Sequence, residues 1–361
     1  MQPCSPLQER GVTRVHVGGG GSSSNDEGAV CSTSAVPPEE GTQFGVWRSL
    51  ALSAMYIGTS TILFLAIRYS KYLEKQSILS YDSTSIVMAM EVTKILVSVV
   101  LKYASDGELL LYSITLAPHR WELWRMSVLY VVPALLYAMY NNLTYISLRH
   151  FDPGTVQLFM QTRILFTGFL SVGVLHRSLS LRQWLALIVL TLGLVIKYIL
   201  PTAVQMMDAR VLVVLLQAFL SSLAGVYNEL ALKREAHLSI HQQNFFLYLY
   251  GIFFNLLFGL ILAPQEYLHG NFFGNAHIIF IPIIFVGALN GLTAAFILKF
   301  INVIVKAFAS AVEVVFMALL AAAVLGEPLT PQDLTAGVFV MCSVYLYYTN
   351  GCGSRRAEKH K

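Results

Sequence analysis

The chain has 361 residues, of which 56% are apolar and only 12% are charged. With a mean hydropathy of +0.62, it has too few polar residues to cover the surface of a water-soluble globule, so a soluble globular protein is excluded. The formal net charge of +4 is modest, and we expect no nucleic-acid partner.

The first 45 residues are rich in Gly and Ser and contain few apolar side chains. We expect a disordered cytosolic tail over residues 1–45. Its glycine run, Gly18 to Gly21, lacks the Gly-Lys-Ser/Thr ending of a phosphate-binding loop, so it predicts no nucleotide site.

Ten apolar stretches of about 20 residues follow the tail, each long enough to cross the hydrocarbon core of a bilayer. Lipid offers backbone polar groups no partner, so each stretch is expected to be a helix. The sequence therefore predicts an all-α, polytopic membrane domain over residues 46–350, followed by a short basic cytosolic tail, 351–361. The expected spans are 47–67, 84–103, 127–148, 154–175, 181–200, 211–231, 244–263, 277–298, 303–325 and 332–349.

The positive charges favour one orientation of these spans. If both termini are cytosolic, sixteen of the 24 lysines and arginines lie on the cytosolic side and six on the other, while Lys94 and Arg163 lie inside spans. Because cytosolic loops carry the excess of positive charge, we expect both termini in the cytosol.

A weak internal repeat divides the membrane domain in two. Residues 174–180, after the fourth span, match residues 324–330, after the ninth, at an offset of 150 that pairs Ser180 with Thr330. Two five-helix repeats, about 46–200 and 208–350, would insert with opposite topology. Inverted repeats are a common architecture of secondary transporters, whose substrate site lies between the halves.

Two charged residues lie three positions apart inside the second span. Glu91 and Lys94 share one helical face, and charges at this depth commonly mark a substrate or ion pathway. The alternative is an intrahelical ion pair that only fixes helix packing.

Arg163 lies near the middle of the fourth span and Glu313 near the middle of the ninth, separated by the same offset of 150. A guanidinium suits bidentate capture of phosphate oxygens. The alternative is an Arg163–Glu313 bridge that closes the bundle. A third hypothesis combines the two, with the substrate phosphate displacing Glu313 from Arg163.

The ninth span carries a polar stripe. Asn302, Lys306 and Glu313 occur at i, i+4 and i+11 and are expected on one face that lines the cavity. In the alternative, Lys306 only extends to the cytosolic surface.

Several amides and one phenol within spans could bond a nucleobase, a ribose or a sugar hydroxyl. Hydrogen bonds between helices explain each of them equally well. They are Asn141, Asn142, Gln157, Gln161, Asn244 and Tyr248.

Several segments together resemble the nucleotide-sugar transporter family that includes CMP-sialic acid and UDP-galactose carriers. The similarity covers the whole membrane region. The segments are Glu91–Lys94, Asn141–Leu143, Asp152–Thr155, Gln157, Gln161–Leu165, Leu223–Glu229 and Asn244–Gly251.

The resemblance implies a ten-helix fold of the drug/metabolite transporter superfamily in the Golgi membrane. It also implies exchange of a cytosolic nucleotide sugar for a lumenal nucleoside monophosphate. Arg163 stands where the family usually has a lysine, and Val156 and Met160 replace usual tyrosines on what we expect to be the face of Arg163. Positions implied to line the nucleotide site are Lys94, Asn141, Asn244, Tyr248 and Lys306.

Alternatives of other classes are an intramembrane enzyme and a non-transporting Golgi scaffold. The sequence shows no paired carboxylates, no Ser/His or Cys/His pair and no metal-ligand cluster, so no catalytic residue, metal site or cofactor is predicted. A UDP-sugar is the favoured substrate, with CMP-sialic acid or another nucleotide sugar as alternatives. The ER membrane as location, and homo-oligomers or glycosyltransferase complexes as assemblies, remain open.

Overall fold

The computed structural model describes residues 45–75, 83–107, 109–116, 118, 120–151, 153–198, 210–262, 280–325 and 328–349. The two predicted tails, apart from Gly45, lie outside the described residues.

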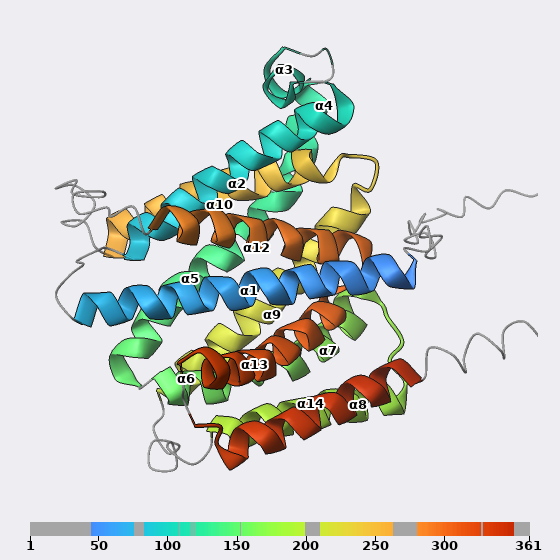
Figure 1. Cartoon of the computed structure of the whole chain (residues 1–361). Coiled ribbons are helices and arrows are strands. Elements are labelled where there is room, and N and C mark those ends of the chain that lie inside the picture. The colour runs from blue at the N-terminus through green and yellow to red at the C-terminus, as the bar shows by residue number, and fades with distance from the viewer. Residues whose placement is uncertain are drawn as a thin grey trace, which may run out of the picture. The chain divides into compact units, whose positions relative to one another are not determined.

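Every regular element among the described residues is helical, as the composition predicts (Figure 1). The helices are α1 (Val46–Lys75), α2 (Ser83–Asp106), α3 (Leu110–Thr115), α4 (Arg120–Ser127), a 3-10 turn (Val128–Tyr130), α5 (Val131–His150), α6 (Pro153–Met160), α7 (Arg163–Leu175), α8 (Leu181–Tyr198), α9 (Val211–Arg234), α10 (Ile240–Leu262), α12 (Phe280–Phe300), α13 (Val303–Leu325) and α14 (Pro331–Thr349).

Seven helical segments among the described residues are long and apolar enough to cross a membrane, which makes the chain a multi-pass membrane protein. They are Trp47–Ile67, Arg120–Thr144, Val156–Leu175, Val211–Arg234, Ile240–Ile261, Phe280–Phe300 and Val303–Leu320. The other three expected spans, 84–103, 181–200 and 332–349, fall on α2, α8 and α14, which are helical but not among the seven.

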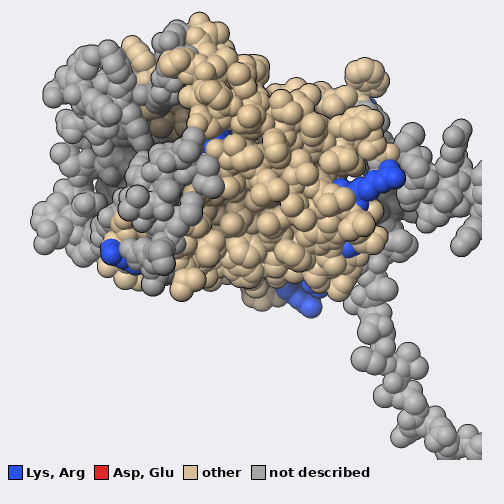
Figure 2. Space-filling view, turned by 90° about the horizontal axis from the view of Figure 1, so that it is seen from below, with Lys and Arg blue, Asp and Glu red and all other residues tan. Residues whose placement is uncertain are grey.

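The surface is that of a protein in contact with lipid. Large apolar side chains are exposed along many of the helices, including Phe169 on α7, Leu212 on α9 and Val338 on α14. The face shown in Figure 2 carries a few Lys and Arg side chains and no visible Asp or Glu. Such extended apolar surface is stable in hydrocarbon and not in water.

The fourth expected span differs from the prediction of one straight helix. A turn at Gln161 and Thr162 separates α6 from α7, and the Gln161 side chain donates to the carbonyl of Gln157 at 3.0 Å. Val156 and Met160 were expected on the face of Arg163 on the assumption of one continuous helix, and this turn interrupts that helix.

Side-chain caps fix the starts of three helices. Ser180 and Gln183 exchange hydrogen bonds at the start of α8, and Ser239 and Gln242 do the same at the start of α10. Thr330 and Asp333 form the corresponding cap of α14. These reciprocal bonds satisfy amide groups that a helix start leaves free.

The helices pack in a consistent set of pairs (Figure 1). α8 lies along α14, α5 along α9, α2 along α10 and α1 along α12. Close approach depends on small residues: a side chain at Gly193 of α8 would collide with Phe339 of α14.

Candidate functional site

Glu91 and Lys94 of α2 form the ion pair that was the alternative interpretation of their spacing, and the pair faces two other helices. The Lys94 Nζ lies 2.5 Å from the Glu91 Oε1, and both side chains are largely buried. The same nitrogen lies 5.0 Å from the ring centroid of Tyr248 on α10, a cation–π contact. On the α12 side, a Cβ at Gly291 would lie 2.7 Å from the Lys94 Cε, so the absence of a side chain there makes room for the lysine.

Three cations and two acids from the two halves of the chain gather at this level. Lys306 of α13 lies within electrostatic range of Lys94 and of Arg163 at the start of α7. It also lies within range of Glu313, about two turns further along α13. Glu313 in turn interacts with Arg163 and Lys306. We call Lys94, Arg163, Lys306, Glu91 and Glu313 the charged cluster.

Helix α1 adds hydroxyl groups beside this cluster. The Tyr56 hydroxyl and the Ser310 hydroxyl of α13 lie 3.1 Å apart, and Ser60 lies within hydrogen-bonding reach of Glu313. None of these three residues was predicted from the sequence. The spacing in the sequence could have indicated them. Ser310 lies one turn after Lys306, and Ser60 lies one turn after Tyr56.

Asn244 and Tyr248 lie one turn apart on α10, and both are buried. Neither the oxygen nor the nitrogen of the Asn244 amide has a hydrogen-bond partner among the described residues. Because a buried amide without partners is costly, this side chain is suited to completion by a ligand.

Other predicted residues lie elsewhere or are already bonded. The Asn142 amide donates to the carbonyl of Ala138 at 2.8 Å, and Gln157 is exposed. Asn302 precedes α13, and its side-chain oxygen accepts from the Val305 N–H at 2.7 Å as a helix cap. Asn141 is partly buried on α5.

Val156 and Met160 lie in an apolar cluster rather than beside the charges. Both are 4% exposed and pack with Val211, Val214 and Ala218 of α9. The turn between α6 and α7 allows this, because it uncouples their face from that of Arg163.

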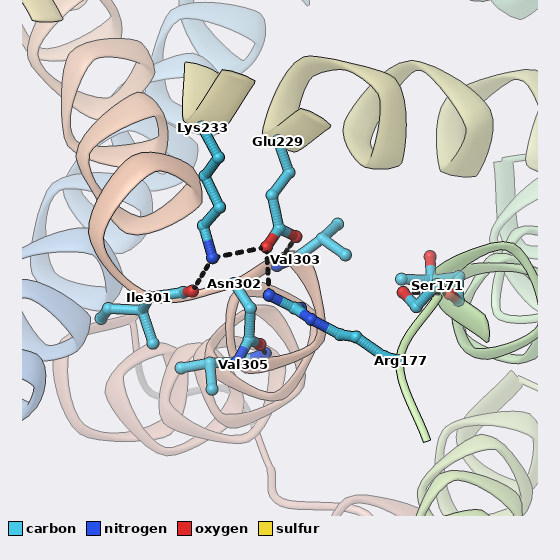
Figure 3. A network of polar contacts seen from close by, with 9 residues as sticks. Ser171, Arg177, Glu229, Lys233, Ile301, Asn302, Val303 and Val305 are labelled. Atoms are coloured by element: carbon cyan, nitrogen blue, oxygen red, sulfur yellow. Dashed lines mark hydrogen bonds and ion pairs between the residues drawn. The ribbon is translucent and has the colours of Figure 1, made fainter. Parts of the chain in front are cut away.

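A second charged group, absent from the sequence predictions, is centred on Glu229 of α9 (Figure 3). Its fully buried carboxylate lies 2.6 Å from the Arg177 Nη2 and 2.9 Å from the Lys233 Nζ, and its second oxygen accepts the Val303 N–H at 2.7 Å. Lys233 also donates to the carbonyl of Ile301 at 2.8 Å. The Glu229 network thus connects the segment after α7, the end of α9 and the α12–α13 turn.

The Lys233 partner was visible in the sequence as an i, i+4 pair. Arg177 and the Val303 amide were not, because only the tertiary fold brings them to Glu229.

These arrangements favour binding of a polyanion over bond-breaking chemistry. The charged cluster offers ammonium and guanidinium donors in a desolvated setting, where phosphate oxygens are bound strongly. Buried amides, phenols and hydroxyls next to it can bond the remainder of such a ligand.

The fold defines a multi-pass helical membrane protein, and the charged cluster is its candidate internal site for an anion. A family model described as "Nucleotide-sugar transporter" matches residues 46–348, and the chain therefore belongs to that family. The match confirms the resemblance and makes the protein a transporter.

Curated relatives cover most of the membrane domain. A UDP-galactose transporter, senju, from Drosophila melanogaster is 32% identical over 320 residues, covering 76% of this chain and 80% of the relative. A UDP-N-acetylglucosamine transporter from Canis lupus familiaris is 30% identical, covering 72% and 82%. CMP-sialic acid transporter 4 from Oryza sativa subsp. japonica is 32% identical, covering 62% and 58%.

A solved structure described only as "Crystal structure of protein" has the same fold. It superposes with a TM-score of 0.62 at 14% identity and covers 86% of this chain and 98% of the other.

Proposed function

We propose that this protein exchanges a cytosolic nucleotide sugar, most favourably a UDP-sugar, for a lumenal nucleoside monophosphate across the Golgi membrane. The observation that carries the proposal is the gathering of Lys94, Arg163 and Lys306 from three helices. Three cations in one desolvated region repel one another, and an anionic ligand relieves that repulsion.

The proposed binding roles follow this geometry. Lys94, Arg163 and Lys306 bind the phosphates, while Asn141, Asn244 and Tyr248 contact the nucleoside. Glu313 competes with phosphate for Arg163 and Lys306, which links ligand arrival to a change in helix packing. Glu91 holds Lys94 in place when no ligand is bound.

A UDP-sugar is favoured because two of the relatives with the greatest coverage are named for UDP-galactose and UDP-N-acetylglucosamine. CMP-sialic acid, for which the rice relative is named, is the alternative.

The helix pairs support ten spans arranged as two inverted repeats. The proposed matching pairs α1, α2, α5, α6–α7 and α8 with α9, α10, α12, α13 and α14. It leaves the contacts of α8 with α14 and of α2 with α10 unchanged and converts the other extensive contacts into one another. For example, α5 with α9 becomes α12 with α1, and α5 with α10 becomes α12 with α2. The capping residues Ser180 and Thr330 also begin matched helices.

Such repeats allow alternating access by movement of one half against the other. The excess of Lys and Arg in the tails and in the loops that join even to odd spans supports cytosolic termini. The Golgi location follows the family resemblance, and microscopy of a tagged chain with Golgi and ER markers tests it.

Counterflow into proteoliposomes tests the exchange itself. Vesicles with the purified protein are preloaded separately with UMP, CMP, GMP or AMP, and labelled UDP-galactose, UDP-N-acetylglucosamine or CMP-sialic acid is added outside. We expect UMP to drive uptake of a UDP-sugar and Arg163→Ala to abolish it.

Empty vesicles and vesicles with preloaded uridine serve as controls. Uptake that is independent of the internal monophosphate would contradict exchange. A folded preparation that takes up none of the three nucleotide sugars would overturn the proposed substrates and favour a scaffold role.

A further inference from the structure

Helix α9 carries two buried amides on one face, next to α5. Gln217 and Asn228 lie 11 residues apart, about three helical turns, and they are 1% and 3% exposed. Both therefore face the interior, and both are near polar groups of α5.

The first amide is saturated by α5. The Gln217 side-chain oxygen accepts from the Ser147 hydroxyl at 2.8 Å, and its nitrogen donates to the Thr144 hydroxyl at 2.8 Å. Gln217 thus has what a structural amide between helices requires.

The second amide is not saturated. The Tyr137 hydroxyl of α5 lies within hydrogen-bonding reach of the Asn228 side chain, but the Asn228 oxygen has no partner among the described residues. A structural role would not leave a buried carbonyl oxygen unbonded, because an acceptor without a donor opposes folding.

Asn228 also lies beside the region assigned to the nucleoside. Its neighbour Tyr137 interacts electrostatically with Tyr56 and with Tyr248. Tyr56 lies next to Ser310, and the ring of Tyr248 lies against the Lys94 ammonium group. The unbonded oxygen therefore belongs to the same group of side chains as the charged cluster, whereas Gln217 lies about 16 Å further along α9.

We propose that the Asn228 side-chain oxygen contacts the transported ligand and accepts a hydrogen bond from a nucleobase N–H or a ribose O–H. Asn228 is then a specificity-determining residue, with Tyr137 holding its amide in orientation. This inference rests on the proposed function and adds a residue to it.

The test compares Asn228→Ala, Asn228→Leu and the matched control Gln217→Leu in the counterflow assay. Alanine leaves a space and leucine fills it, while both remove the acceptor. For each variant, the half-inhibitory concentrations of external UMP, CMP, GMP, AMP and 2′-deoxy-UMP are measured together with the melting temperature without ligand.

We expect both Asn228 variants to weaken inhibition by the preferred monophosphate about tenfold, the usual effect of losing one hydrogen bond within a site. Their melting temperatures should stay within a few degrees of the wild type. Gln217→Leu should lower the melting temperature and leave the order of the nucleotides unchanged.

The pattern of losses identifies the ligand group. If the wild type prefers UMP to 2′-deoxy-UMP and the Asn228 variants do not, the donor is the ribose hydroxyl. If preference among the four bases collapses instead, the donor is the base. If the external nucleotides inhibit the Asn228 variants as strongly as the wild type, and the wild type exchanges, this inference alone is overturned. A wild type that exchanges nothing overturns the proposed function and this inference with it.

Discussion

The charged cluster and the Glu229 network use the same residue types in opposite ways. Around Glu229, one fully buried acid receives two cations and a backbone N–H at 2.6 to 2.9 Å. In the charged cluster, Lys306 has Lys94 and Arg163 as neighbours of like charge, with Glu313 as the opposing acid.

We interpret this difference as one between charges that hold the fold and charges that bind a ligand in the proposed function. A buried acid is stable only when short contacts saturate it, and the Glu229 network meets that condition within the chain. The cations of the charged cluster repel one another, and in the proposed function an incoming phosphate compensates their charge.

The largest expected effect is on the Glu229 network. Glu229→Ala leaves Arg177 and Lys233 facing each other without an acid, and we expect a loss of about 3–5 kcal/mol in the free energy of unfolding. Melting in detergent measures this, with the exposed Glu122→Ala as control. Equal melting temperatures for the two variants would show that the network does not hold the fold.

The next effect separates binding from stability in the charged cluster. Arg163→Ala removes one of three cations, so the ligand-free melting temperature should be unchanged or raised. The affinity for a nucleoside monophosphate should fall about 10- to 100-fold, because a charge-assisted hydrogen bond is lost. Arg163→Lys keeps the charge without the bidentate geometry, so its affinity for the monophosphate should lie between that of the wild type and that of Arg163→Ala. A ligand-free protein that unfolds without Arg163 would assign it to the fold instead.

A smaller effect on ligand binding is expected from filling the space beside Lys94. Gly291→Ala places a methyl group 2.7 Å from the Lys94 Cε, so the lysine must move, and we expect several-fold weaker binding. Gly173→Ala, with no atom near its added methyl group, is the matched control on α7. Inhibition curves that coincide for the two variants would remove Lys94 from the binding site.

The smallest effect concerns the ion pair between α8 and α14. The Lys197 Nζ lies 3.0 Å from the Asp333 Oδ1, with side chains 18% and 16% exposed, and the pair joins the last turn of α8 to the first turn of α14. Lys197→Met should therefore lower the free energy of unfolding by about 1 kcal/mol or less and leave exchange unchanged. A larger loss in the free energy of unfolding would show that this pair holds the fold, as we expect of the Glu229 network.

The sequence predicted a helical, multi-pass membrane protein and placed Glu91 and Lys94 on one helical face, because both features depend on residues close together in the chain. It also placed Ser180 and Thr330 at matched positions. It missed the turn at Gln161, because no glycine or proline marks that position.

The site residues that the sequence missed are those whose partners lie on other helices. Glu229 and Asn228 were noted only within a segment resembling the family. Their roles depend on Arg177, Val303 and Tyr137, which the sequence alone does not bring near them.

The central claim, that the charged cluster binds phosphate, is tested most directly by ligand-induced stabilisation of the purified protein. A ligand that binds only the folded state raises the melting temperature. Each of UMP, CMP, GMP and AMP is compared with its nucleoside, in the wild type and in Arg163→Ala. The account predicts that one monophosphate stabilises the wild type more than its nucleoside does, and that Arg163→Ala removes the difference. Equal stabilisation by nucleoside and monophosphate in the wild type would contradict it.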